Sequence, residues 1–187
     1  LPPGYLIKWG GQFELQQEAN RRLAVVIPIT LFVVFLLLFS NFNSLKNALL
    51  ILLNIPLALV GGVVALWLTG ENLSVPASVG FIALFGIALE NGMVLVTYLN
   101  QLLRAGIPVD TASIQGACLR LRPVLMTAIT TALGLLPLLF SSGTGSEVQR
   151  PLATVVVGGL VTSTVLTLLV LPSLYKWFAI DIEKNVV

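Results

Sequence analysis

The sequence predicts an all-α membrane protein, folded as a bundle of five transmembrane helices. Hydrophobic residues make up 57% of its 187 residues and charged residues only 10%, and its mean hydropathy is +0.99. Four windows of 23 to 25 residues contain no charge, and a fifth stretch of 32 residues contains one. About 20 predominantly apolar residues are enough for a helix to cross a bilayer. A soluble domain of this size cannot cover so many apolar helices, so a soluble globular fold is excluded.

The spans are expected in the order of these windows. They lie at residues 23–45, 47–70, 72–103, 123–146 and 151–175. The first window follows a polar stretch without a small-residue cleavage site, so it is a span and not part of a signal peptide. Pro56, Pro137 and Pro172, like Gly61 and Gly62, are expected either to kink helices or to permit sliding against neighbours, because proline lacks the backbone N–H of a regular helix and glycine is flexible. The third span contains the single charge, Glu90.

Five spans place the two ends of the chain on opposite sides of the membrane, and the abrupt polar start indicates a fragment of a longer protein. The positive-inside rule predicts that residues 41–46, 104–122 and the carboxyl tail are cytoplasmic, with six Lys and Arg residues against four on the other side. Residues 104–122 are expected either to form a short interfacial helix capped by Asp110 or to anchor the following span, and the second role is favoured.

Glu90 is the strongest candidate for a functional residue. It is expected about 2.5 residues past the middle of its span, ~4 Å from the midplane. An ionised carboxylate at this depth costs at least ~2.5 kcal/mol, so it should face a partner or a water-filled cavity. A functional role in binding a proton is favoured; the alternative is a Glu that hydrogen-bonds a neighbouring helix and stays protonated.

Small and polar side chains recur at helical spacing around this site. The face of the third span expected to pack inward comprises Ala83, Gly86, Glu90, Val94, Thr97 and Gln101. The matching face of the fourth span comprises Pro123, Thr127, Thr130, Gly134, Pro137 and Ser141. Antiparallel packing would bring Thr127 within ~4 Å of the depth of Glu90, where its hydroxyl either relays a proton or bonds its own backbone. In the last span, Gly159, Ser163 and Thr167 are interpreted as a packing seam.

The composition excludes several functions. The chain has no His, one Cys (Cys118) and two Met (Met93 and Met126), so neither a metal site nor a cofactor site is predicted. Metalloproteases and serine hydrolases that depend on His are excluded. An intramembrane aspartyl protease is excluded because Asp110 and Asp181 lie outside the spans. The chain is therefore not expected to be an enzyme, and its scattered basic residues offer no surface for nucleic acid.

Three stretches resemble the carboxyl-terminal membrane half of resistance-nodulation-division (RND) exporters. They are GGQFELQQEANRRL, the run from NIPLALVGG to ENGMVLV, and the run from RLRPVLMT to VLPSLY. The most specific elements are LRPVLMT, GLLP and GTGSE, and the resemblance covers nearly the whole chain up to Lys176. It implies a fragment of a twelve-helix, proton-driven transporter that works as a homotrimer in the bacterial inner membrane.

The resemblance also implies a domain organisation. Residues 1–22 would be the end of a periplasmic porter region, residues 23–178 would be helices eight to twelve, and residues 179–187 would be a cytoplasmic tail. The missing amino-terminal half and porter domains would complete the transporter. Its partners would be a periplasmic adaptor and an outer-membrane channel, besides protons, metal cations and the lipid bilayer.

The heavy-metal efflux branch of the family fits these residues best. Multidrug members usually carry Lys where this chain has Glu90, and a carboxylate is typical of the heavy-metal branch. Thr127 and Arg120 match a Thr and an Arg that the family uses in its proton path, so the predicted proton relay is Glu90, Thr127 and Arg120. Some exporters of monovalent copper and silver have Lys where this chain has Val124, which favours divalent zinc, cobalt, nickel or cadmium. A multidrug or lipid exporter and a non-transporting membrane remnant are the alternatives.

Overall fold

A computed structural model describes residues 12–183 of the chain. This region contains no strand, and its six α-helices are α1 Gln12–Phe42, α2 Leu45–Leu52, α3 Asn54–Thr69, α4 Val75–Arg104, α5 Val109–Leu139 and α6 Ser146–Glu183. Because α2 and α3 together form one span, the described residues contain five segments long and apolar enough to cross a membrane. The predicted all-α fold with five spans is therefore confirmed.

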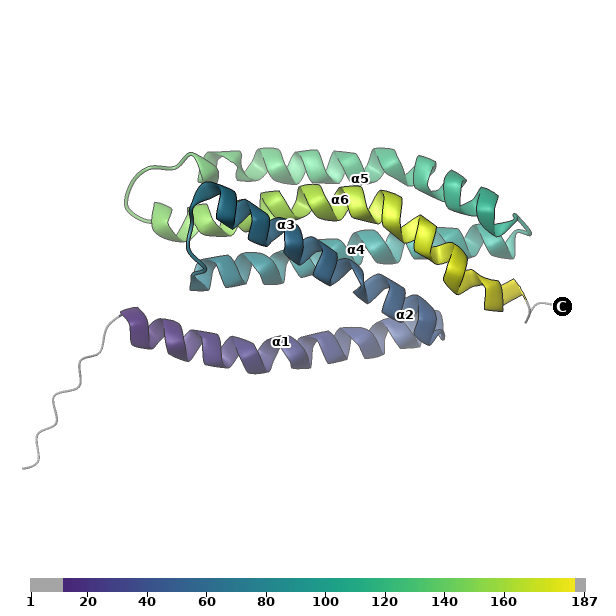
Figure 1. Cartoon of the computed structure of the whole chain (residues 1–187), viewed down its shortest axis with the longest axis horizontal. Coiled ribbons are helices and arrows are strands. Elements are labelled where there is room, and N and C mark those ends of the chain that lie inside the picture. The colour runs from purple at the N-terminus through teal and green to yellow at the C-terminus, as the bar shows by residue number, and fades with distance from the viewer. Residues whose placement is uncertain (1–11, 184–187) are drawn as a thin grey trace, which may run out of the picture.

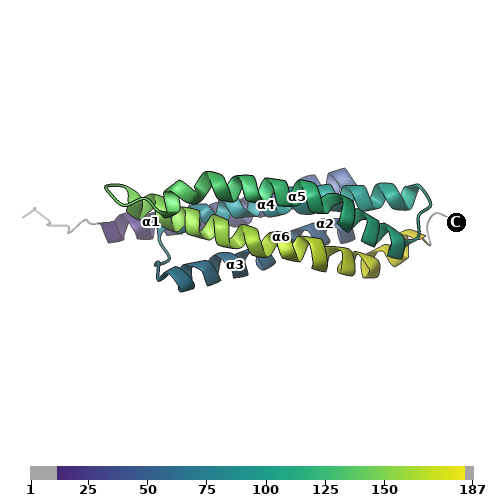
Figure 2. The same cartoon turned by 90° about the horizontal axis from the view of Figure 1, so that it is seen from above.

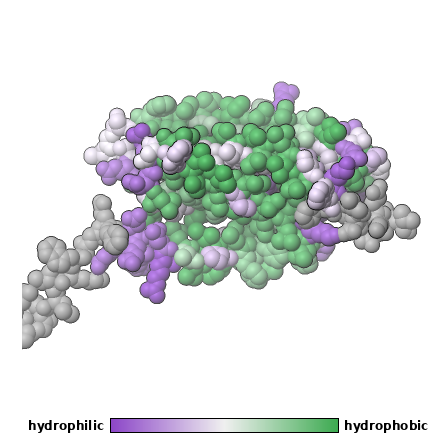
Figure 3. Space-filling view, viewed as in Figure 1, coloured by the Kyte–Doolittle hydropathy of each residue, from purple (hydrophilic) through white to green (hydrophobic). Residues whose placement is uncertain are grey.

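The long helices lie side by side along one axis, as Figures 1 and 2 show. α1 starts at the left end of Figure 1 and α6 finishes at the right end, as an odd number of crossings requires. Hydrophobic side chains cover the middle of the bundle, and hydrophilic ones gather towards its two ends (Figure 3). Large apolar side chains in this belt point outward, and Leu68 and Leu169 are 71% and 65% exposed. A belt of this kind matches the hydrocarbon layer of a bilayer.

Polar turns set the helix boundaries. Ser44 and Ser74 are the N-caps of α2 and α4, and each hydroxyl accepts a hydrogen bond of 3.4 Å from the backbone N–H three residues later. Gly70 ends α3 with a φ of 67°, a left-handed conformation that favours glycine. The α3–α4 loop is fastened to α6 by an ion pair of 3.3 Å between Glu71 and Arg150.

α6 is the central helix of the bundle and contacts α2, α3, α4 and α5. Gly159 lets α4 approach α6 closely, because a Cβ at this position would overlap the side chain of Leu84. Ser163 and Thr167 follow Gly159 at intervals of four residues and are 1% and 0% exposed. The predicted packing seam is therefore confirmed, and small side chains allow the close contact.

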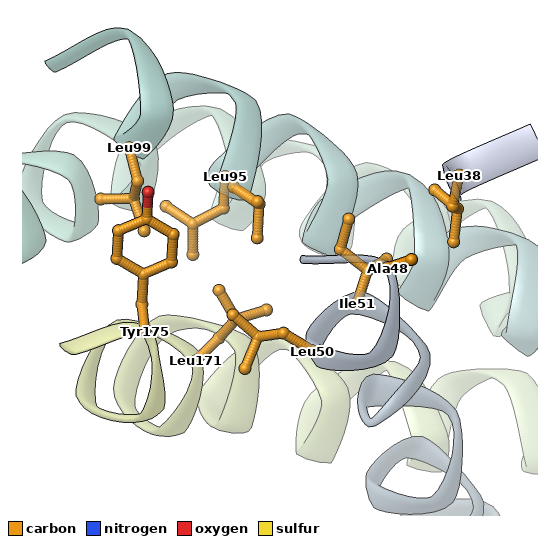
Figure 4. Close-up of a cluster of buried hydrophobic side chains, with 9 residues drawn as sticks. Leu38, Ala48, Leu50, Ile51, Leu95, Leu99, Leu171 and Tyr175 are labelled. Atoms are coloured by element: carbon orange, nitrogen blue, oxygen red, sulfur yellow. The ribbon is translucent and has the colours of Figure 1, made fainter. Parts of the chain in front are cut away.

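A buried hydrophobic cluster joins α1, α2, α4 and α6 (Figure 4). Its members are Leu38, Ala48, Leu50, Ile51, Leu95, Val96, Leu99, Leu171 and Tyr175. The Tyr175 hydroxyl donates a hydrogen bond to Asn100 Oδ1, which satisfies the polar tip of the buried ring. Because Leu38 lies four residues before the end of α1, this helix is attached to the others near its carboxyl-terminal end.

The prediction that residues 104–122 form a loop between two spans is wrong. α4 ends at Arg104 and α5 already starts at Val109, so most of this segment is the first part of α5 and not a loop with a separate helix. Pro108 is the N-cap, and Asp110 forms an ion pair of 2.7 Å with Lys176 instead of capping. At 31 residues α5 is ~46 Å long, so it extends beyond the ~30 Å hydrocarbon layer. A continuous helix satisfies its own backbone as it leaves the bilayer.

Of the three prolines expected to kink a helix or to permit sliding, Pro56 lies just after an interruption between α2 and α3 at Leu53, whereas Pro137 and Pro172 lie inside the continuous helices α5 and α6. The domain boundaries predicted at residues 22 and 178 fall inside α1 and α6, and the domain assignment stays a prediction. The other residues assigned to the porter region and the tail, 1–11 and 184–187, lie outside the described residues.

Gly80→Ala is expected to lower the free energy of unfolding by about 1–3 kcal/mol. The new Cβ would lie 2.9 Å from the Leu152 carbonyl oxygen, a backbone atom that cannot rotate away. Gly86 in the same helix is the matched control, because a Cβ there meets nothing within 4 Å. Gly86→Ala should be neutral or stabilise by up to ~1 kcal/mol. Denaturant unfolding in detergent micelles measures both, and equal stability of the two variants would contradict this packing.

Cys118 reports the orientation of the bundle, because it is exposed near the start of α5. The Lys and Arg bias predicts that this end is cytoplasmic. A membrane-impermeant thiol reagent should therefore label Cys118 after lysis, but not in intact cells with a permeabilised outer membrane. Cys118→Ser measures the background, and labelling in intact cells would reverse the orientation.

Candidate functional site

Glu90 lies at the middle of α4. The helix runs from Val75 to Arg104, so its centre falls within ~1 Å of Glu90 along the axis. This is closer to the centre than the sequence predicts, because the helix expected within the window 72–103 ran from Pro76 to Leu99, whereas α4 continues to Arg104. The other Asp and Glu residues of the chain lie outside the five predicted spans. Glu90 is therefore the one carboxylate placed at mid-membrane depth.

The face of α4 that carries Glu90 points away from the other helices. Glu90 is exposed, and so are Ala83, Gly86 and Gln101, while Val94 and Thr97 are half-buried. The prediction that this face packs inward against another of the five spans is wrong. The face that does pack inward carries Gly80, Leu84, Ala88, Asn91 and Leu95. Uncharged side chains form this contact, because burying a lone carboxylate would be costly.

Thr127 of α5 is also exposed, and its Oγ1 donates a hydrogen bond of 3.1 Å to the Pro123 carbonyl oxygen. The rest of its predicted face is exposed in Thr130, Gly134 and Pro137 and half-buried in Ser141. The faces of Glu90 and Thr127 are thus not buried against each other, contrary to the prediction. In this conformation the Thr127 hydroxyl bonds its own backbone.

The register between α4 and α5 sets the depth of Thr127. A Cβ on Gly116 would overlap the side chain of Leu99, so these two residues lie level. Because the two helices are antiparallel, residues whose numbers add up to about 215 (116 + 99) share a depth, and Glu90 is level with residue 125. Thr127 is two residues further on, ~3 Å along the axis.

Arg120 lies closer to the α4–α5 turn than the other two relay candidates. Its side chain is half-buried, and its guanidinium carbon is 5.1 Å from the centroid of the Tyr98 ring. This geometry is a cation–π contact between α5 and α4. Since Arg120 precedes Thr127 by seven residues, it lies ~10 Å from the depth of Thr127.

Two buried amide residues were missed by the sequence reasoning. Asn54 and Asn91 are at least nine-tenths buried, as are Ser163 and Thr167 of the predicted packing seam. A search for charges passes over both amides, because they are neutral. The available signal was the pair of amide side chains, Asn54 and Asn91, in the middle of apolar runs.

A metal site with the usual donors is not formed by the described residues. No three His, Cys, Asp or Glu side chains there lie together in a way that would hold a metal ion. Met93 and Met126 are 37% and 60% exposed on α4 and α5, and Cys118 is exposed as well. The carboxylate that α4 places at mid-membrane depth belongs to Glu90.

Comparison with known proteins identifies the relatives of the chain. The sequence model of the AcrB/AcrD/AcrF family matches residues 1–179. The chain is 53% identical over 176 residues to the cobalt-zinc-cadmium resistance protein CzcA of Cupriavidus metallidurans. It is 50% identical over 174 residues to the nickel and cobalt resistance protein CnrA of the same organism. These alignments cover 94% and 93% of this chain but only 17% and 16% of the two relatives, about a sixth of their length.

A crystal structure of a heavy metal efflux pump shares the fold, with a TM-score of 0.82 and 50% sequence identity. The match covers 95% of this chain and 18% of the pump. The family consists of transporters, so the chain is not an enzyme. Sequence, fold and family model agree over nearly the whole chain, and the chain belongs to the AcrB/AcrD/AcrF family of RND exporters, among its heavy-metal efflux members.

Proposed function

We propose that this chain is the proton-coupling membrane part of a cation/proton antiporter that exports divalent heavy-metal ions. The observation that carries the proposal is Glu90, a carboxylate at the centre of a membrane helix and on an exposed face of the bundle. An ionised carboxylate facing hydrocarbon costs several kcal/mol, on the order of 3 by insertion measurements. The Glu90 face therefore suits contact with a further helix or with water, where the carboxyl can gain and lose a proton.

In this proposal Glu90 takes up a proton from the periplasmic side and releases it to the cytoplasm. Protonation neutralises the carboxylate and lowers the free-energy cost of its position at mid-membrane depth. The protonated and the ionised state therefore favour different arrangements of the helices. Thr127, at nearly the same depth, would hold a hydrogen bond to the carboxyl or to a water beside it. Arg120, nearer the α4–α5 turn, would lower the cost of a negative charge on the exit path.

The proposed substrate is a divalent cation such as zinc, cobalt, nickel or cadmium. Support comes from the names of two relatives, a cobalt-zinc-cadmium resistance protein and a nickel and cobalt resistance protein. Because the described residues hold no cluster of metal donors, the metal is expected to be handled by other parts of the transporter. Those parts would include periplasmic porter domains that begin upstream of α1, an adaptor and an outer-membrane channel, in a trimer set in the inner membrane.

Changing Glu90 to Gln in the full-length exporter should abolish proton-coupled metal transport. Gln keeps the volume and the hydrogen-bonding groups of Glu but cannot ionise. Glu90→Asp should keep partial activity, and Thr127→Val should do less harm than Glu90→Gln, because water replaces a hydroxyl in part. Transport of zinc into proteoliposomes under an imposed pH gradient is the measurement.

Glu147→Gln serves as the matched control, because Glu147 lies in the first turn of α6 and outside the charge-free spans. It should transport at the parental rate, and all variants should assemble equally in size-exclusion chromatography. A parental rate for Glu90→Gln would leave Glu90 a packing residue and remove the proposed mechanism.

The 187 residues expressed alone should insert as five helices and confer no metal resistance. The chain spans about a sixth of the length of its relatives, so most of the proposed transporter is absent from it. Growth of a zinc- and cobalt-sensitive strain measures resistance, with membrane fractionation as the control for insertion. Growth on toxic zinc supported by these residues alone would contradict the proposal that coupling needs further helices.

A further inference from the structure

Four buried polar side chains at the centre of the bundle take no part in the proposed proton path. These residues, here called the polar layer, are Asn54 of α3, Asn91 of α4, and Ser163 and Thr167 of α6. They are 2%, 9%, 1% and 0% exposed. In the described part of the chain, Nδ2 of each Asn and the hydroxyl oxygens of Ser163 and Thr167 are buried without a hydrogen-bond partner.

Two contacts fix the register of α4 against α6. Gly159 packs on Leu84, and the Tyr175 hydroxyl bonds Asn100. The residue numbers differ by 75 in each pair (159 − 84 and 175 − 100), which is the pattern of two parallel helices. A residue of α4 therefore lies level with the residue of α6 whose number is 75 higher.

This register brings three members of the polar layer to one depth. Asn91 is level with residue 166, between Ser163 and Thr167 and within ~5 Å of both along the axis. Ser163 and Thr167 lie on the face of α6 that Gly159 presents to α4, at intervals of four residues. Asn91 follows Leu84 by seven residues, two helical turns, so it lies on the face of α4 that contacts α6.

Asn54 joins this depth from α3. A Cβ on Gly92 would overlap Asn54 Nδ2, so the amide of Asn54 packs against the backbone beside Asn91. Asn54 is also the first residue after the interruption between α2 and α3. Pro56 has no N–H, so the Leu52 carbonyl, two residues before Asn54, lacks its usual helical donor. The polar layer thus lies next to a backbone acceptor as well.

We propose that the polar layer binds ordered water where α3, α4 and α6 meet. The layer lies near the middle of α4, a depth at which the bilayer supplies no solvent, and buried polar groups without a partner are costly there. Water suits the unpaired groups, since its oxygen accepts from the two Asn Nδ2 groups and its hydrogens reach hydroxyl or carbonyl oxygens. A metal cation does not suit them, because the unpaired amide atoms are donors.

Bound water would give the α4–α6 contact a function that apolar packing lacks. Water molecules exchange hydrogen-bond partners readily, so the contact can shift without leaving a polar group unpaired. Asn91 follows Glu90 directly in the sequence, so the hydrated contact lies on the helix that carries the carboxylate. The proposal itself does not depend on proton transport, because it concerns only the packing of α3, α4 and α6.

Hydroxyl-radical footprinting of the full-length exporter in nanodiscs tests the proposal. Radiolysis labels side chains that touch bound water, even inside a protein. Leu95 lies one turn after Asn91 and is 1% exposed, while Leu84 and Leu99 are 0% exposed and lie about two turns from Asn91. Labelling of Leu95 should be several-fold higher than that of Leu84 and Leu99. Equal labelling of the three leucines would mean a dry layer and would overturn the proposal.

Thr167→Val is the second test of the proposal, because it removes one hydroxyl of the polar layer and keeps the side-chain shape. It should reduce the labelling of Leu95 and lower the thermal unfolding midpoint of the exporter. Thr162→Val is the matched control, since Thr162 bonds the Gly159 carbonyl of its own helix at 3.0 Å, and it should leave the labelling unchanged. If Thr167→Val prevents assembly, Ser163→Ala takes its place. Unchanged labelling in Thr167→Val together with unchanged or higher stability would show that its hydroxyl has no water partner.

Discussion

The bilayer interior supplies no water, and this constraint accounts for most of the structure. Backbone groups must find partners inside the chain, so the described residues form helices and short turns and no strand. The polar groups that satisfy the helix ends lie outside the apolar belt. Ser44 and Ser74 are N-caps, and Glu71 in the α3–α4 loop forms an ion pair with Arg150. Apolar side chains have no hydrogen-bonding group to satisfy, so they can point outward into lipid. The middle of the bundle therefore exposes many of them.

In such a medium apolar burial gives little drive for association, so close packing has to supply it. The glycines of α3, α4 and α6 remove the side chains that would otherwise separate these helices. α6 packs against α3, α4 and α5 and acts as the axis of the bundle, whereas α1 is only 6% buried over its most apolar stretch. Its position beside α2 and α4 near one end leaves most of α1 open to lipid or to further protein. The spans formed by α2 with α3, by α4 and by α6 are therefore the buried part of the bundle, whereas α5, which is 11% buried, and α1 lie at its outside.

The sequence was sufficient to predict the number of spans and the Gly159 seam, and Pro56, which follows the interruption between α2 and α3, was one of three prolines expected to kink a helix or to permit sliding. Each of these follows from local chemistry: absence of charge, a missing N–H, and small side chains at intervals of four. The faces of Glu90 and Thr127 were predicted inward and lie outward, because small and polar residues indicate a contact without saying which helix makes it. α5 was predicted to begin near residue 123 because charges end a hydropathy window, although a helix can continue past them into solvent. Asn54 and Asn91 were overlooked because neutral amides do not interrupt an apolar run.

Glu90 and Asn91 show how one helix can use polarity in two ways. Successive residues of a helix are about 100° apart, so the two side chains face different surroundings at nearly the same depth. Asn91 is neutral and can be buried if its amide gains hydrogen bonds, which the neighbouring polar side chains or water can provide. An ionised carboxylate is not fully stabilised by a few neutral hydrogen bonds, and the five helices leave Glu90 exposed. The inward residue therefore belongs to the packing of this bundle. The outward residue faces away from these five helices, and in the proposed antiporter its need for a further helix or for water would couple a protonation event to a rearrangement of the helices.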